Sequence, residues 1–171
     1  MNDSRLQVFI SSKMRRNALR AEREAARNAV KALGFADAWD WETCGYADCR
    51  PPMQICLQAV RRSDVLVLLV GRDLTSHTKA EHREAIRCKK ADFIFVKRCS
   101  LKPETRNYLH RQGKRCTYQV FRSPQELTSG IQLSIWNHLM AVYRSANQPE
   151  IGTRHTSGKQ LIEGEQAPPV R

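Results

Sequence analysis

Five short apolar runs along the chain each have the length and composition of a β-strand. They are Leu6–Ser11, Phe35–Trp41, Asp64–Gly71, Asp92–Arg98 and Cys116–Phe121. The third run, DVLVLLVG, is apolar at nearly every position. Such continuity is typical of a parallel strand buried on both of its faces. The pattern therefore predicts a sheet that is covered on both sides.

Between these runs, apolar positions recur with the spacing of amphipathic helices. The expected helices cover Met14–Leu33, Met53–Ser63, the segment Arg72–Lys90 after an opening loop, Pro103–Gly113 and Ser123–Ser145. Gly34 follows the first of them, as a residue just past a helix C-terminus often does. Ser123, Pro124 and Glu126 fit a capping box at the last helix. Gly, Asp and paired Pro residues make Glu42–Pro52 a loop.

Strand and helix alternate along the chain, which predicts an α/β domain with a doubly wound parallel sheet and helices on both faces. Five strands favour the flavodoxin-like order 2-1-3-4-5. We assign residues 1–146 to this domain and expect the polar segment 147–171 to be disordered. In such sheets, ligands bind outside the carboxyl ends of the strands, where the first and third strands meet.

Polar residues follow three of the predicted strands at that edge. They are Ser11 and Ser12 after the first strand, Trp41 and Glu42 after the second, and Gly71 after the third. The stretch TSHTKAEHREA, from Thr75 to Ala85, comes directly after the third strand. These residues would converge at one rim of the sheet, with the indole of Trp41 as a stacking surface.

The stretch TSHTKAEHREA contains two glutamates that the helical pattern does not separate. On a helical wheel, both Glu81 and Glu84 fall within the apolar arc that contains Ala85 and Cys88. Glu81 is one turn closer to the rim, and we expect it in the first turn, where the helix dipole favours a carboxylate. It is either part of a site or a glutamate that only stabilises the helix start.

The charge of the chain favours anionic partners. Its formal net charge is +12, and all of it lies on residues 1–146 because the basic and acidic residues of 147–171 cancel. Nucleotides, nucleic acids and acidic proteins are the partners that this balance suggests. The segment Lys13–Lys31 carries seven basic and two acidic residues. Aromatic residues do not interleave with the basic ones, so nucleic-acid binding is not expected.

Several other classes of protein are not indicated. No stretch is long and apolar enough for a transmembrane helix, and the N-terminus lacks the apolar core of a secretory signal. We therefore expect a cytoplasmic protein without a membrane contact. The six cysteines form no C-x-x-C pair, and the histidines lack metal-ligand spacing, so no metal or cofactor is expected. No glycine-rich phosphate loop follows the first strand.

Five segments carry a family likeness: VFISSKM, AEREAARNAVKALGF, RPPMQICLQAVRRSDVLVLLVG, SHTKAEHREA and DFIFVK. Together they resemble an uncharacterised bacterial TIR-like domain family, which is related to TIR domains and to nucleoside deoxyribosyltransferases. The likeness covers Leu6–Arg98 closely and Pro103–Leu139 loosely. It implies a five-stranded flavodoxin-like sheet, in agreement with the pattern of strands and helices.

The resemblance also implies a reaction. In catalytic relatives, a glutamate on the helix after strand three acts at a ribose, and the matching residue here is Glu81. The implied activity is cleavage of the nicotinamide–ribose bond of NAD, or of another nucleotide N-glycosidic bond, with NAD as substrate and not as cofactor. The implied nucleotide-binding residues are Ser11, Ser12, Trp41, Glu42, Gly71 and Thr78.

The same resemblance implies an alternative function as a non-catalytic signalling or self-assembly module. The loop Glu42–Pro52, which contains Tyr46, would then form the contact of a homo-oligomer. His82 stands where relatives usually carry Tyr or Phe, and Lys13–Ala18 is strongly basic where relatives commonly carry an acidic residue.

Overall fold

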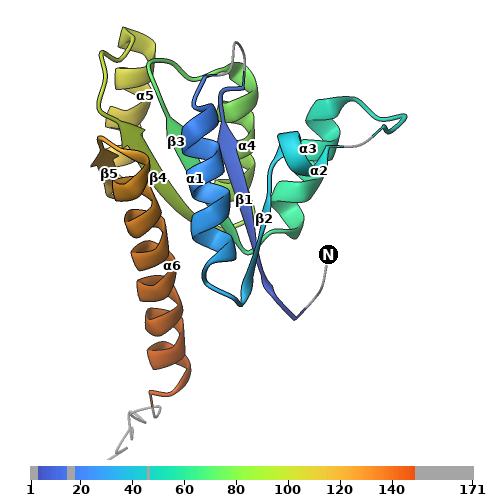
Figure 1. Ribbon diagram of the computed structural model, residues 1–171, viewed down its shortest axis with the longest axis vertical. Helices are drawn as coiled ribbons and strands as arrows, with labels where there is room; N and C mark the ends of the chain where they lie inside the picture. Colours follow the sequence, from blue (N-terminus) through green and yellow to red (C-terminus); the bar gives the residue numbers. More distant parts are fainter. Residues whose placement is uncertain (1–3, 15–17, 46, 149–171) are drawn as a thin grey trace, which may run out of the picture.

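The computed structural model describes residues 4–14, 18–45 and 47–148. Five parallel strands form one sheet in the order β2-β1-β3-β4-β5 (Figure 1). The strands are β1 (Leu6–Ser12), β2 (Ala36–Trp39), β3 (Val65–Val70), β4 (Ala91–Lys97) and β5 (Tyr118–Phe121). The predicted flavodoxin-like α/β fold and its strand order are confirmed.

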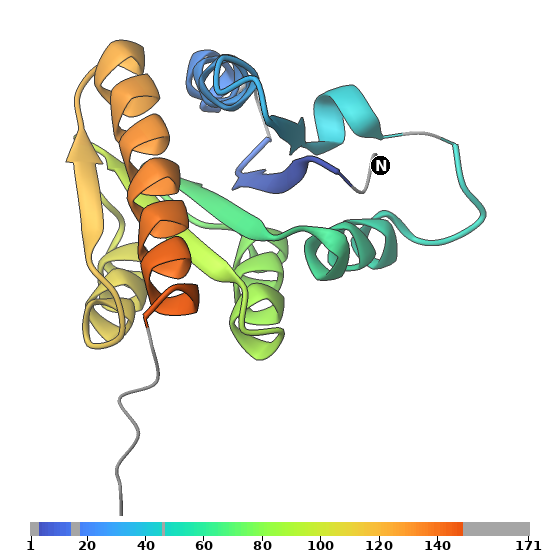
Figure 2. The same ribbon diagram turned by 90° about the horizontal axis from the view of Figure 1, so that it is seen from below.

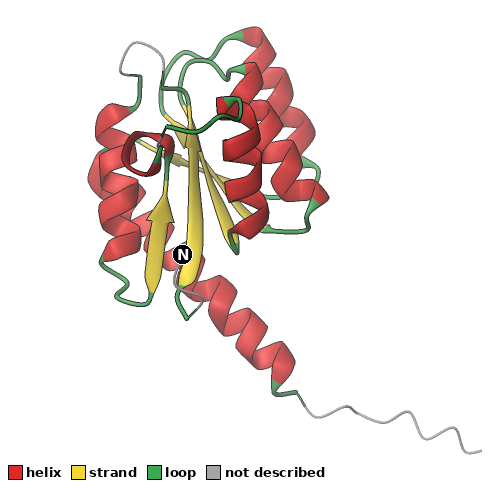
Figure 3. Cartoon of the chain, turned by 90° about the vertical axis from the view of Figure 1, so that its right-hand side faces the viewer, coloured by secondary structure: helices red, strands yellow, loops and turns green. Residues whose placement is uncertain are grey.

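Helices cover both faces of the sheet (Figures 2 and 3). They are α1 (Arg20–Lys31), α2 (Trp41–Cys44), α3 (Pro52–Arg62), α4 (Ser76–Arg87), α5 (Pro103–Gly113) and α6 (Pro124–Ala146). Helices α1 and α6 pack on one face, and α3, α4 and α5 pack on the other. Among the helices of the described residues, none has the length and apolar character needed to cross a membrane.

The central strand β3 belongs to both halves of the core. All six of its residues are buried. Val67 and Leu69 face α1 and α6, whereas Leu66 and Leu68 face the helices of the opposite layer. Each buried aliphatic side chain of this kind contributes about 1.5–3 kcal/mol to folding. The continuous apolar run of the sequence therefore reflects burial on two sides.

The first helix is shorter than the apolar pattern predicts. It begins at Arg20 and not at Met14, and residues 15–17 lie outside the described residues. Leu19 directly precedes the helix and has a left-handed backbone, with φ of 58°. Its side chain packs over Gly71, where an added Cβ would lie 3.2 Å from Leu19 Cδ2. A contact with the end of β3 therefore holds Leu19 out of the helix.

The second predicted strand is also too long, and the loop after it contains a helix. Strand β2 ends at Trp39, and Trp41 begins the short helix α2. The carboxylate of Asp40 accepts hydrogen bonds from the backbone N–H groups of Glu42, at 2.8 Å, and Thr43, at 3.3 Å. This capping arrangement ends the strand and begins the helix.

Two predictions fall on residues outside the described part of the chain. Tyr46, in the loop predicted for self-assembly, is one of them. The polar tail is the other, since residues 149–171 are not described. The last described helix ends at Ala146.

Candidate functional site

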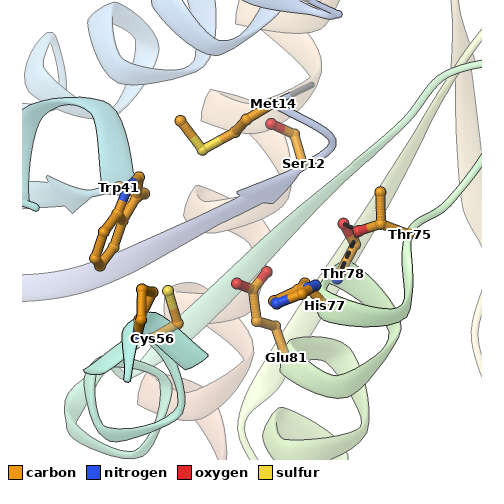
Figure 4. A pocket seen from close by; sticks show the side chains of 9 residues that line it. Ser12, Met14, Trp41, Cys56, Thr75, His77, Thr78 and Glu81 are labelled. Atoms are coloured by element: carbon orange, nitrogen blue, oxygen red, sulfur yellow. Dashed lines mark hydrogen bonds between the residues drawn. The ribbon is translucent and has the colours of Figure 1, made fainter. Parts of the chain in front are cut away.

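A pocket of about 280 Å³ opens at the carboxyl ends of β1 and β3 (Figure 4). The loop after β1, the start of α2, the first turns of α3 and the first turns of α4 surround it. Its lining residues are Ser12, Met14, Trp41, Pro52, Cys56, Thr75, His77, Thr78 and Glu81. The pocket thus lies at the edge where a sheet of this order binds ligands.

Glu81 lies in the wall of the pocket, and its carboxylate points into the space between Cys56 and His77 (Figure 4). The side chain is almost completely buried, with 9% of the residue exposed. The hydroxyl of Ser11 donates a hydrogen bond to Glu81 Oε2 at 2.5 Å. Ser11 of β1 therefore fixes the orientation of the Glu81 carboxylate on α4.

Helix α4 begins too early in the sequence for Glu81 to lie in its first turn, where the sequence predicted it. The hydroxyl of Thr75 accepts a hydrogen bond from the backbone N–H of Thr78 at 3.1 Å, and the first helical residue is Ser76. Glu81 consequently lies in the second turn, so the prediction of a first-turn glutamate is wrong. The helix dipole acts mainly within the first turn, which makes it a weak influence on Glu81.

Burial determines the protonation of Glu81. It raises the pKa of this carboxyl to about 7, and the hydrogen bonds from Ser11 and Cys56 oppose the rise only in part. Among the described residues, no basic side chain forms an ion pair with Glu81. A buried carboxylate without a cation is unfavourable in its charged form, so positive charge on a ligand would stabilise it.

Glu84 has a different environment on the same helix. Its carboxylate accepts hydrogen bonds from Arg87 Nη2 at 2.6 Å and Arg61 Nε at 2.5 Å. These contacts, led by the one with Arg87, lower the pKa of Glu84 to about 2 against a smaller opposing effect of burial. The structure thus separates the two glutamates that the helical wheel left together, and only Glu81 reaches the pocket.

The structure brings three of the predicted binding residues to the pocket. Ser12, Trp41 and Thr78 line it together with Glu81. Ser11 lies behind the wall, fully buried, and contacts the pocket only through its hydrogen bond to Glu81. It therefore positions the carboxylate and does not itself line the space.

Glu42 is not a lining residue of this pocket, contrary to its predicted place. Its carboxylate accepts hydrogen bonds from Arg23 Nε at 3.0 Å and Nη2 at 2.5 Å, and from Arg27 Nη1 at 3.2 Å. These bonds, led by the one from Arg23, lower the pKa of Glu42 despite burial. Arg23 is almost fully buried and also donates to Ser12 Oγ at 3.3 Å. Glu42 therefore neutralises an arginine behind the pocket.

Gly71 is likewise outside the pocket. It lines a separate cavity of about 240 Å³ with Lys13, Arg72, Asp73 and Lys97. The packing of Leu19 on Gly71 explains why the end of β3 carries no side chain at this position. A pocket does lie at the edge of the sheet that the sequence predicts, but the sequence could not show on which side of β3 each residue would lie.

Cys56 is the most informative lining residue that the sequence analysis missed. It lies on α3, and its thiol is close enough to the carboxylate of Glu81 for each group to shift the pKa of the other. Burial, and secondly the nearby carboxylate, raises the pKa of this thiol to about 12. The thiol is therefore neutral and can donate a hydrogen bond. Within the described parts of the chain, no group of His, Cys, Asp and Glu residues is arranged to hold a metal ion.

His82 points away from the pocket and holds α4 in place. It is completely buried, with Nδ1 at 2.7 Å from the hydroxyl of Tyr108 and Nε2 at 2.7 Å from Asp92 Oδ2. Arg115 also donates to Asp92, at 2.9 Å from Nη1 to Oδ1. His82 thus joins α4 to β4 and α5.

Comparisons with known proteins support the fold more than the chemistry. A family model described as a domain of unknown function (DUF4062) matches residues 7–138, and no curated protein matches the chain. A CMP N-glycosidase from Clostridium botulinum, BcmB, is similar in structure with a TM-score of 0.56 and 14% identity, over 74% of this chain and 98% of that one. A conserved protein from Enterococcus faecalis V583 has a TM-score of 0.50 and 13% identity, over 75% and 98%. The link to TIR domains and nucleoside deoxyribosyltransferases stays a prediction.

Proposed function

This chain belongs to the DUF4062 family, and we propose that it hydrolyses the N-glycosidic bond of a nucleotide, with Glu81 as the catalytic carboxylate. One observation carries the proposal: a buried carboxylate without a cationic partner among the described residues points into the pocket at the ligand-binding edge of the sheet. The CMP N-glycosidase with the same fold supports the reaction class. The resemblance to TIR-like domains supports NAD as a further candidate substrate.

The chemistry of the bond fits such a group. When the N-glycosidic bond breaks, the base leaves with the bonding electron pair, and positive charge develops at the anomeric carbon and the ring oxygen of the ribose. A fixed carboxylate beside that carbon stabilises the charge or captures it covalently, and water completes the hydrolysis. The attraction is strongest where the site excludes water. The burial of Glu81 provides such an environment.

Other pocket residues would bind the rest of the nucleotide. Trp41 faces Glu81 across the pocket and offers an indole on which the base can stack (Figure 4). Ser12 Oγ accepts a hydrogen bond from Arg23, which leaves its hydroxyl hydrogen free to be donated to a ligand oxygen. Thr78 lines the side that α4 provides.

The test is release of the free base from NAD and from CMP, separated by chromatography. We expect release by the parent chain and a loss of at least about 100-fold in Glu81→Gln, because the variant keeps the shape but not the charge. Glu84→Gln, on the same helix, is the matched control and should retain activity. The proposal fails if no base is released at high protein concentration, or if Glu81→Gln is as active as the parent.

Self-assembly through the loop Glu42–Pro52 stays an alternative prediction without a specific contact in its favour. Glu42 is occupied by Arg23 and Arg27. Arg50 Nε donates to Asp48 Oδ1 at 2.9 Å. In the described part of this loop, these polar groups thus have partners within the same chain.

A further inference from the structure

A stripe of large apolar side chains runs along the outer side of α6. Leu133, Trp136 and Tyr143 are 60%, 54% and 63% exposed, and Met140 is partly exposed between them. We call these four residues the α6 seam. Their spacing of three, four and three residues places them within about 80° of one another on the helix, as in the seam of a coiled coil. The buried residues of α6 are Leu127, Gly130, Ile131 and Ile135.

The C-terminal end of α6 extends beyond the rest of the molecule (Figures 1 and 3). The helix has 23 residues, which corresponds to about 35 Å, whereas the seven residues of β1 span about 23 Å. Residues 141–148 are all exposed. Short helical segments without tertiary packing are only marginally stable in water. A partner that packs along the seam would stabilise this end.

The charge of α6 indicates what this partner is. From Leu127 to Tyr143 the sequence contains no Asp, Glu, Lys or Arg, although the chain as a whole has a net charge of +12. Two copies of so basic a protein repel each other over most of their surfaces, and this helix is a face where they can meet without that repulsion. An acidic partner would instead bind a basic face. The large apolar residues of the segment 149–171 have no pair spaced three or four residues apart, so the segment lacks a matching stripe; they are Ile151, Leu161, Ile162 and Val170.

We propose that the α6 seam is the interface of a homodimer in which two α6 helices pack antiparallel about a two-fold axis. An axis between Trp136 and Met140 places Trp136 against the partner's Met140 and Leu133 against the partner's Tyr143. Each large aromatic ring then faces a smaller aliphatic side chain, and the two copies of Arg144 lie far apart. Self-complementary pairing of this kind is what a two-fold interface requires.

Sedimentation of the full chain over a roughly hundredfold range of concentration tests the proposal, because a small interface gives a reversible dimer. We expect a monomer–dimer equilibrium that the double variant Trp136→Glu, Tyr143→Glu abolishes. Both residues are exposed, so circular dichroism should be unchanged. Val120→Glu is the matched control, since Val120 is also exposed, at 53%, but lies on β5 outside the seam.

The register of the two α6 helices is tested with one cysteine added to each of two protein samples. Protein with Leu133→Cys, mixed with protein with Tyr143→Cys, should form a disulfide between the two different positions, which mass spectrometry of the peptides identifies. A monomer at every concentration, a dimer that survives the double variant, or a link between two copies of position 133 would overturn the proposal. So would loss of the dimer when residues 149–171 are removed or when the loop Glu42–Pro52 is shortened.

Discussion

Two glutamates one turn apart on α4 show how strongly the surroundings of a single residue decide its chemistry. Glu81 is buried without a cation among the described residues, and its pKa is raised to about 7. Glu84 is held by two arginines, and its pKa is lowered to about 2. Their helical positions are similar, so the difference comes from the elements that pack against α4. Burial of Glu81 in its charged form should weaken the fold.

Glu81→Gln is therefore expected to stabilise the protein at neutral and alkaline pH. The pKa of Glu81 is about 7 in the folded chain, against an unperturbed 4.5, so the folded state binds the proton more tightly. Stability is lost as the pH rises from about 4.5 to 7, and the loss is on the order of 3 kcal/mol above pH 7. Urea unfolding at pH 8 should show this gain for the variant, and at pH 4 the difference should disappear.

Glu84→Gln is the control, because the pKa of Glu84 is shifted in the opposite direction to that of Glu81. A carboxyl whose pKa is lowered contributes stability that is present above its unfolded pKa and is lost as the pH falls toward about 2. Its substitution should leave stability unchanged or slightly reduced at pH 8. If Glu81→Gln shows no gain over Glu84→Gln at pH 8, the carboxyl of Glu81 is not destabilised by its burial.

Among the elements, those defined by local patterns were predicted well. The five strands follow from continuous apolar runs, and their order follows from the alternation with helices. The boundaries that failed depend on contacts distant in sequence or on a cap. Leu19 is held out of α1 by Gly71, and the side chain of Asp40 begins α2. The same reason explains why the role of Cys56 was missed, since it arises only where α3 meets α4.

Helix α4 depends on His82 for its attachment to β4 and α5. In His82→Phe, the buried hydroxyl of Tyr108 and the carboxylate of Asp92 each lose a hydrogen-bond partner. Each lost partner costs about 1–3 kcal/mol, so we expect a fall of about 2 kcal/mol or more in the free energy of unfolding. Urea unfolding at pH 7 measures it.

The exposed His110 on α5 provides the comparison for this change. His110→Phe makes the same substitution at an exposed position, where no buried contact is broken. Its free energy of unfolding should equal that of the parent. Equal stability of His82→Phe and the parent would show that the hydrogen bonds to Tyr108 and Asp92 do not stabilise the attachment of α4.

Across the whole molecule, ion pairs use much of the acidic charge and leave basic charge in excess. Asp73 pairs with Lys13 and Lys102, and Asp92 pairs with Arg115. The remaining basic charge gives the chain its formal net charge of +12, and the resulting field attracts a phosphate group. Such a field acts over about 8 Å at physiological salt and is screened at higher ionic strength.

This field predicts that the phosphate of a nucleotide contributes to binding in a salt-dependent way. If the pocket takes a nucleotide, CMP should bind Glu81→Gln more tightly than cytidine does at low salt, and its affinity should fall several-fold as salt is raised to about 0.5 M. Cytidine carries no charge, so its affinity should change little. Isothermal titration calorimetry of both ligands on the same variant measures the difference. Equal salt dependence for the two would mean that the basic surface does not contribute to nucleotide binding, and the attraction would then have to come from the ribose and the base alone.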